Sequence, residues 1–356
     1  MKSLPGIVLL LAAGTAGLTL AAGAAGGAAT SSPQIRRVTG SIEALAVDGS
    51  RIAYDVGSTT GKTDNKVLVW NVGTGKTTTV SGKHTRTADT SSTGSGVFEL
   101  ALAGSRVAWL VNVGGNLEGD DYLFASSVTK PKERKLVTET REGDTCPGRQ
   151  SDCAGEWLGG LVGSGSLIAV NRWTTDGTGA VTNGGLYALD AATTKQIAAG
   201  SDTVEAASVD RGRVVVLRSD GTVGMYSSSG DLLRTVAPSS TTAVALSGHN
   251  LVVLTKERTL ELYYAPSGSP SRTFFLRGSQ TPRNLDVQGE IAIYSVGGAV
   301  HALDLGSGKD RVIGKLGGGI GFARISSAGV VYSNIRVASR GTLVFVPLRR
   351  VTAAVG

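Results

Sequence analysis

Small apolar and β-branched residues alternate with polar ones through most of the chain, and tight glycine-containing turns interrupt the alternation. Seven segments share one order: a small-apolar run, a turn, then a β-branched run. The first apolar residue after each turn is Ile52, Val107, Ile168, Val214, Leu251, Ile291 or Val330. Side chains that alternate with a period of two, between turns this frequent, predict antiparallel strands.

Each of these hairpins is followed by a second one. Its first strand is illustrated by 67–71, 186–190 and 300–304, and a polar turn then leads to an outer strand. Four strands in units of roughly 40 to 45 residues, repeated seven times, are typical of a β-propeller. We therefore predict an all-β fold: a single β-propeller of seven blades over residues 41–356, each of four antiparallel strands, without an amphipathic helix. A pair of β-sandwiches or another β-solenoid is the alternative.

The two ends of the chain compete for one place in such a ring. A propeller protects its blade edges by closing, so one terminal segment must pair with the last blade. Residues 30–40 contain an outer-strand pattern at 34–39, and the segment 351–355 is the other candidate.

Residues 1–29 have the pattern of a secretory signal peptide. Lys2 precedes an apolar stretch over 7–20, and small residues at 22–24 fit a cleavage site. An uncleaved membrane anchor is the alternative. We predict an exported protein, secreted or held in the cell envelope, with no membrane span after cleavage. In such a compartment Cys146 and Cys153, the two cysteines of the chain, are expected to form a disulfide.

Several outer hairpins resemble those of known propeller families. Segments 185–195 (GLYALDAATTK) and 298–309 (GAVHALDLGSGK) resemble pyrroloquinoline-quinone-type repeats, and 67–76 (VLVWNVGTGK) resembles the same hairpin of WD repeats. The whole resembles exported TolB-like propellers. The Trp docking motif of the quinone enzymes and the Gly-His signature of WD repeats are missing, so the resemblance implies the fold and leaves the chemistry open.

Composition adds few constraints. The 51 glycines are largely explained by hairpin turns, and the net charge of +7 is scattered, with small clusters at 130–135 and 349–350. Basic residues without interleaved aromatic residues do not predict nucleic-acid binding. The histidines His84, His249 and His301 fall in different parts of the repeat. We therefore predict no catalytic residue, no metal site and no cofactor.

One enzymatic alternative remains at the sequence level. A propeller hydrolase or lactonase would hold a metal, such as Ca²⁺, in its central channel. The polar residues that the innermost strands offer as ligands for such a metal are Glu43, Glu99, Glu205, Asn284 and Asp286. The other innermost positions are mostly Ala, Leu and Val, which favours a binding protein over an enzyme.

The connections between the second and third strands differ around the ring. They are long in blades 1 to 3, at 56–66, 111–121 and 172–184, and short in blades 4 to 6. Long loops grouped on one side of a rigid scaffold commonly carry binding. The candidate binding residues on this side are Glu118, Asp120, Asp121, Trp157, Arg172, Trp173 and Asp176. We expect a monomer that binds a protein, peptide or glycan there; tolerated insertions are the other explanation of the long loops.

Overall fold

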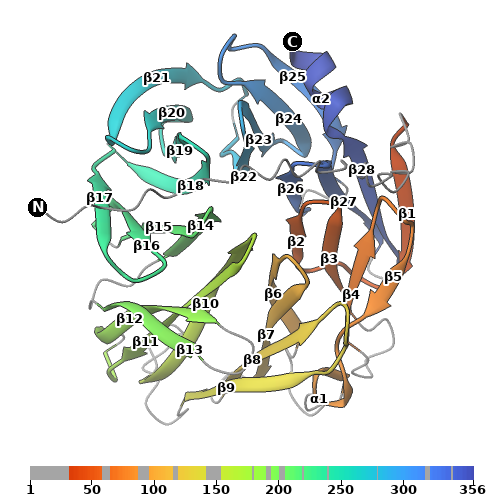
Figure 1. The fold of residues 1–356 in the computed structure, drawn as a ribbon, viewed down its shortest axis with the longest axis vertical. Coiled ribbons are helices and arrows are strands. Elements are labelled where there is room, and N and C mark those ends of the chain that lie inside the picture. The colour runs from red at the N-terminus through yellow and green to blue at the C-terminus, as the bar shows by residue number, and fades with distance from the viewer. Residues whose placement is uncertain are drawn as a thin grey trace, which may run out of the picture.

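The computed structural model describes residues 32–57, 65–86, 96–114, 119–141, 154–178, 180–189, 194–199, 205–218, 220–238, 240–278, 280–316, 321–337 and 340–356. Within these ranges the strands form seven antiparallel blades of four strands, arranged around an axis (Figure 1). Two of the blades are joined into one eight-stranded sheet. The predicted all-β, seven-bladed propeller is confirmed. The expected signal peptide at 1–29 and the expected Cys146–Cys153 disulfide lie outside the described residues.

In the first four blades the chain runs from the innermost strand outward. Blade 1 contains β2 (Leu45–Asp48), β3 (Arg51–Val56), β4 (Lys66–Asn71) and β5 (Thr77–Thr79). A short helix, α1 (Lys83–Arg86), leads to blade 2, with β6 (Gly96–Ala103), β7 (Arg106–Gly114), β8 (Gly119–Ser127) and β9 (Arg134–Arg141). Blade 3 contains β10 (Gly155–Ser164), β11 (Leu167–Thr175), β12 (Val181–Leu189) and β13 (Thr194–Ala199). Blade 4 contains β14 (Glu205–Asp210), β15 (Arg213–Leu217), β16 (Val223–Ser227) and β17 (Leu232–Val236).

The remaining blades follow the same order until the ring closes. Blade 5 contains β18 (Thr241–Ser247), β19 (Asn250–Thr255), β20 (Thr259–Tyr264) and β21 (Ser269–Phe275). Blade 6 contains β22 (Arg283–Gln288), β23 (Ile291–Val296), β24 (Ala299–Asp304) and β25 (Asp310–Lys315). Blade 7 contains β26 (Ala323–Ser326), β27 (Gly329–Val337) and β28 (Arg340–Pro347), and the chain ends in α2 (Leu348–Val355).

The N-terminal strand β1 (Gln34–Thr39) is the outer strand of blade 7. It pairs antiparallel with β28, from Gln34 opposite Phe345 to Thr39 opposite Arg340. Figure 1 shows the two ends of the colour range, β1 and β28, side by side. The first and last parts of the chain thus close the ring together.

The segment 351–355 is helical instead of forming a closing strand, which corrects the prediction that the chain has no amphipathic helix. Val351 and Val355 of α2 are fully buried in a cluster with residues of blades 6 and 7. The helix begins directly after Pro347, whose fixed φ ends β28. Two valines four positions apart lie on one helix face, which is enough to seat a helix of two turns against a blade.

The hydrophobic core is divided into layers between adjacent blades. Blades 1 and 2, for example, enclose Ala53, Val69, Leu102 and the fully buried Trp109. Alanines of the innermost strands, such as Ala46, Ala101 and Ala245, line the axis. Small side chains are required there because the innermost strands converge.

Neighbouring blades are also joined by a repeated pair of hydrogen bonds at their inner turns. The last residue of a first strand accepts the N–H of the turn glycine in the next blade, and the residue three positions later donates to the carbonyl of that glycine. The pairs are Asp48 and Arg51 with Gly104, Asp210 and Arg213 with Gly248, and Ser247 and Asn250 with Gly289. Because acceptor and donor have the same spacing each time, the contact is built into the repeat.

None of the helices in the described ranges is long and apolar enough to cross a membrane.

Candidate functional site

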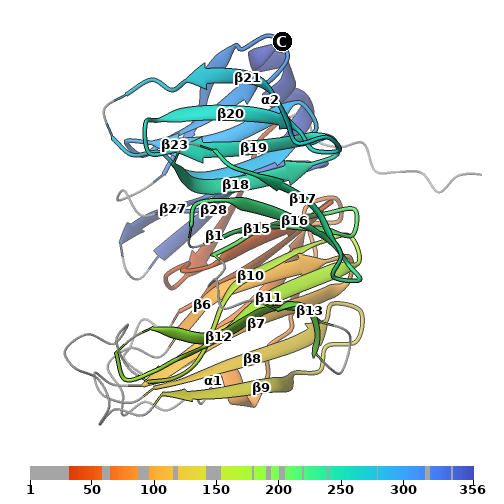
Figure 2. The same ribbon diagram turned by 90° about the vertical axis from the view of Figure 1, so that its left-hand side faces the viewer.

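The hairpins of blades 2 and 3 project beyond the ring on one side (Figure 2). The strands β7 and β8 stay paired as far as Gly114 opposite Gly119, and β11 and β12 as far as Thr175 opposite Val181. The prediction that 111–121 and 172–184 are loops is therefore wrong for most of their length. In both segments the strands simply continue past the ring, because residues on the two sides of each turn pair across the hairpin.

The corresponding connections of blades 4 to 6 are short, as predicted from the sequence. Thr255 and Thr259 of blade 5 bracket a three-residue turn, and Val296 and Ala299 of blade 6 a two-residue turn. The asymmetry between the early and middle blades is thus a property of the fold. Blade 7 also has a long hairpin, β27–β28, which was not predicted from the lengths of the connections in the sequence.

Blades 2 and 3 merge where their projecting strands meet. Arg141 of β9 pairs with Gly155 of β10, so that the two blades form one continuous sheet. Asp121 of β8 is buried; its carboxylate accepts a hydrogen bond from the side chain of Asn112 at 2.8 Å and lies 3.5 Å from the backbone nitrogen of Leu158 in blade 3. Asp121 therefore connects the two blades instead of facing solvent.

An ion pair lies at the same junction. The guanidinium of Arg172 on β11 contacts the carboxylate of Glu139 on β9 and lies over the ring of Tyr187, 5.2 Å from the ring centroid. The Glu139 side chain is 1% exposed, whereas that of Arg172 is 33% exposed. Arg172 thus stabilises a buried acid while about a third of its own side chain remains exposed.

A small cavity of about 110 Å³ opens next to this ion pair. Its lining includes Glu139, Glu156, Arg172, Asn183 and Tyr187. Burial and the neighbouring carboxyl group of Glu156 raise the pKa of Glu139 to about 7, against the opposing effect of Arg172. The cavity therefore offers an acid that changes its charge near neutral pH, an arginine and an aromatic ring.

Two tryptophans form the other conspicuous feature of the projecting sheet. Trp157 of β10 and Trp173 of β11 are directly opposite each other, with parallel rings whose centroids are 6.2 Å apart. The indole N–H of Trp157 donates to the hydroxyl of Thr175 at 2.8 Å. Both rings are only partly buried. Stacked aromatic residues across a hairpin stabilise it, and their exposed edges offer area for a partner.

The structure brings most of the predicted residues onto these hairpins, with different contacts. Asp120 accepts a hydrogen bond from the hydroxyl of Tyr122 at 2.7 Å. Asp176 accepts hydrogen bonds from the hydroxyl and backbone N–H of Thr178 and from the N–H of Ala180, so it shapes its own turn. The hydroxyl of Thr178 is the main cause that lowers the pKa of Asp176. Glu118 lies outside the described residues.

Glu139, Glu156 and Tyr187 of the cavity were not found by sequence reasoning. The signal for Glu139 was weak: it is a single acid at an inward position of an outer strand, between two threonines. Its partner Arg172 is on another blade, and the repeat pattern carries no information about contacts between particular blades.

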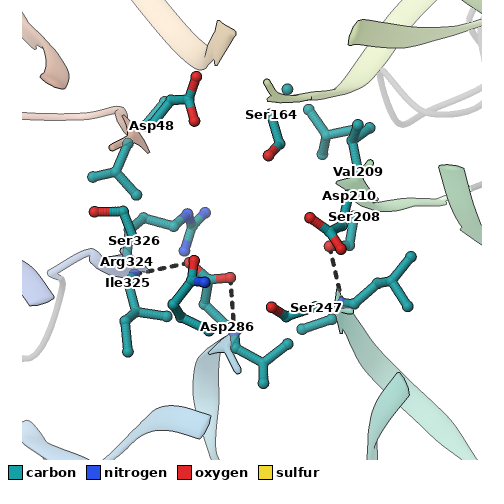
Figure 3. A pocket seen from close by; sticks show the side chains of 18 of the residues that line it. Asp48, Ser164, Ser208, Val209, Asp210, Ser247, Asp286, Arg324, Ile325 and Ser326 are labelled. Atoms are coloured by element: carbon teal, nitrogen blue, oxygen red, sulfur yellow. Dashed lines mark hydrogen bonds between the residues drawn. The ribbon is translucent and has the colours of Figure 1, made fainter. Parts of the chain in front are cut away.

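The central channel is lined by polar side chains at one end. Figure 3 shows Asp48, Asp210, Asp286, Arg324 and several serines around an opening of about 190 Å³. The carboxylates accept backbone N–H groups of the next blade: Asp286, for example, binds the N–H of Ile325 at 2.9 Å. Burial raises the pKa of Asp286, and the charge of Arg324 opposes that shift.

Glu99 and Asn284, two further residues on which the enzymatic alternative relies, are also engaged in hydrogen bonds. Glu99 accepts the N–H of Gly160 at 3.1 Å and that of Leu161 at 2.5 Å, and burial raises its pKa. Asn284 donates to the hydroxyl of Ser295 and the carbonyl of Gly321. Among the described residues, no three His, Cys, Asp or Glu side chains come together as a group that could hold a metal ion.

No protein-family model matches the chain, and the comparison with curated proteins also finds no match. Among solved structures, the WD40 β-propeller domain of Doa1 is similar, with a TM-score of 0.54 and 9% identity over 88% of this chain and 95% of that domain. This likeness shows the fold. The chain is a β-propeller. The computationally designed Ika8 protein has a TM-score of 0.47 at 14% identity, over 86% of this chain and 97% of that one. BamB from Moraxella catarrhalis has a TM-score of 0.42 at 10% identity, over 85% of each chain.

Proposed function

We propose that this protein is an exported, non-enzymatic binding scaffold. Its partner, a protein, peptide or glycan, docks on the face formed by the long connections of blades 1 to 3, which includes the projecting hairpins of blades 2 and 3. The observation that carries the proposal is the partly exposed pair Trp157 and Trp173 beside the partly exposed Arg172, on a sheet that extends beyond the ring. Trp and Arg are the residue types most enriched at binding hot spots. The leader-like segment 1–29 supports export.

The rigidity of the projecting sheet supports this proposal. The tips of free loops lose conformational entropy on binding, whereas paired strands are already ordered. Here the β9–β10 pairing and the Glu139–Arg172 contact hold two hairpins together. A partner therefore meets a preformed surface.

The enzymatic alternative, a hydrolase or lactonase with a metal in the central channel, ranks second. Three channel carboxylates, Asp48, Asp210 and Asp286, already accept backbone N–H groups from the neighbouring blade. Glu99 does the same. Metal analysis of the purified protein is the direct test, and one tightly held calcium per chain would reverse the order.

The binding proposal is tested with variants whose ligand binding and folding are measured separately. The variant W157S/W173S removes both rings, and a second variant replaces residues 174–183 by an Asn-Gly turn, which favours hairpin closure. Partner capture from an extracytoplasmic fraction and binding to a glycan array are compared with those of the wild type. Thermal unfolding reports whether each variant is folded.

We expect the folded variants to capture at least tenfold less ligand than the wild type does. The matched control is Tyr264→Ser, which removes an aromatic ring that is 48% exposed on blade 5, away from the projecting sheet; it should capture as the wild type does. Undiminished capture by both hairpin variants would contradict the proposal.

A further inference from the structure

A second cavity, of about 360 Å³, lies between blades 2 and 3 at the turn that joins β8 to β9. This turn opens on the side opposite to the projecting hairpins. The floor of the cavity is apolar and comes from both blades: Val107, Ala108 and Ala125 of blade 2, and Ile168 and Leu189 of blade 3. Its volume is at the lower end of the roughly 300–1,000 Å³ that is typical of small-molecule sites.

Two alanines meet at the floor of the cavity, at a pair of positions where five of the other blades have at least one larger side chain. Ala108 of β7 is directly opposite Ala125 of β8, and both belong to the layer facing blade 3. The equivalent opposite pairs of blades 1, 4, 5, 6 and 7 are Ala53 with Val69, Val215 with Met225, Val252 with Leu262, Ile293 with Ala302, and Val331 with Phe345. Only blade 3 shares the alanine pair, with Ala169 opposite Ala188.

The rim of this cavity is basic. Lys130, Lys132, Arg106 and Arg134 line it, and no acidic side chain is among its lining residues. Lys130 and Lys132 are exposed on the turn. Arg106 donates to the carbonyls of Leu189 and Ser166 and so fixes blade 3 at the edge of the opening. Three basic residues of the cluster at 130–135, namely Lys130, Lys132 and Arg134, thus lie at an apolar opening.

The acid nearest in sequence does not neutralise this rim. The carboxylate of Glu133 points to the start of α1, where it accepts the N–H groups of Gly82 and His84 at 2.8 Å and that of Thr85 at 3.2 Å. Four donors, including the hydroxyl of Thr85, share its charge. Glu133 is thus engaged at α1, and among the described residues that line the cavity every charged side chain is basic, which gives the opening a positive field.

We propose that this cavity binds the acyl chain of a small amphipathic anion, of the class of medium-chain fatty acids. The chain enters between Ala108, Ala125, Ile168 and Leu189, and the carboxylate remains at the rim with Lys130 and Lys132. The apolar floor favours an anion with an alkyl chain over an inorganic anion, because only the chain gains free energy by burial there. A cationic rim favours an acid over an alcohol of the same length, because the ammonium groups form charge-assisted hydrogen bonds with a carboxylate.

The test is calorimetric titration of the wild-type protein with decanoate below its micellar concentration. Decanol supplies the same chain without the charge, and acetate supplies the charge without the chain. We expect decanoate to bind, decanol to bind at least tenfold more weakly, and acetate not to bind. The absence of decanoate binding would overturn the proposal, and so would equal binding of decanoate and acetate.

Two variants locate the binding. Ala125→Leu fills the floor, and K130E/K132E reverses the charge of the rim; each should weaken decanoate binding at least tenfold. Ala125→Leu should leave the thermal midpoint unchanged or raise it, because it fills a void. The charge control is K76E/K256E, which changes exposed lysines of blades 1 and 5 and should bind as the wild type does. If only the lysine variant loses binding, the ligand lies on the surface and the proposal is wrong.

Discussion

Arg172 and Glu139 connect two blades through side chains that are far apart in the sequence. Removal of the guanidinium leaves Glu139 buried without its cation, although the partial exposure of Arg172 moderates the cost. Arg172→Met keeps most of the apolar stem and should lower the free energy of unfolding by about 1–3 kcal/mol, measured by urea denaturation. Adding Glu139→Gln should recover part of that loss. A double variant that is no more stable than Arg172→Met would contradict the role of this pair.

Asp55 gives the clearest pH dependence in the molecule. The side chain is buried, and its carboxyl group accepts the N–H groups of Glu43 and Ala44 at 2.7 and 2.8 Å. Burial raises its pKa from 3.8 to about 7. Between these two values the folded state holds a proton that the unfolded state has released. This group therefore makes the protein less stable as the pH rises from about 4 to about 7.

Asp55→Asn should remove that contribution. As the pH rises across this range, the free energy of unfolding of Asp55→Asn should increase relative to that of the wild type by on the order of 3 kcal/mol. Urea denaturation at several pH values measures this difference. Asp176→Asn is the matched control, because the pKa of Asp176 is lowered and its contribution is instead lost as the pH falls below the usual range of a carboxyl group. A constant difference between Asp55→Asn and the wild type over the whole range would refute the assignment.

At the scale of elements, α2 is held to blades 6 and 7 by two buried valines. Val351→Ala and Val355→Ala each remove two methyl groups from a closed site, which should cost about 1–3 kcal/mol. Arg350→Ala, at an exposed position of the same helix, should change stability by less than about 0.5 kcal/mol. Thermal or urea unfolding distinguishes the two. Equal effects at Val351 and Arg350 would mean that the helix contributes nothing through packing.

The elements differ in how well the sequence predicts them. All seven second strands begin near the apolar residues aligned after the turns, because glycine turns and β-branched runs act locally and repeat. The length of the projecting hairpins was not predicted. The glycine and polar residues in 111–121 and 172–184 are typical of loops, but pairing across each hairpin makes most of these residues parts of strands. The helix α2 was missed because two valines in eight residues give little periodic signal.

Contacts between blades lie beyond this kind of prediction. Trp157, Arg172 and Trp173 were identified by residue type on a long connection, and the structure places them on one sheet. Glu139 and Glu156 belong to the same site, but they lie on the strands β9 and β10, outside the long connections that drew attention in the sequence. The alanine pair Ala108 and Ala125 likewise does not predict a cavity by itself, because a cavity depends on how the side chains of the neighbouring blade pack against the pair.

At the scale of the whole molecule, stability depends on the closure of the ring. A chain that begins at residue 41 lacks β1 and leaves the outer edge of β28 unpaired. The six opposed residue pairs carry about six backbone hydrogen bonds. At roughly 0.5–1 kcal/mol each, their loss should lower the free energy of unfolding by about 3–6 kcal/mol, and the open edge should promote self-association. Size-exclusion chromatography with light scattering and urea unfolding measure both effects. Addition of a peptide with the sequence of residues 32–40 should reverse them; an unchanged, monomeric truncated chain would show that β1 is dispensable.

The pairing of β1 with β28 also determines when the protein can be finished during its synthesis. The strand β1 is made early, at residues 34–39, and its partner at 340–345 is made only after the strands of blades 1 to 6. Blades 1 to 6 rely on nearby segments and are able to form in order, whereas closure of the ring has to wait for β28. A product that stops even a short distance before residue 340 therefore lacks the partner strand, however well its other blades are made. Completion of this fold therefore depends on the synthesis of β28, a long stretch of chain after β1.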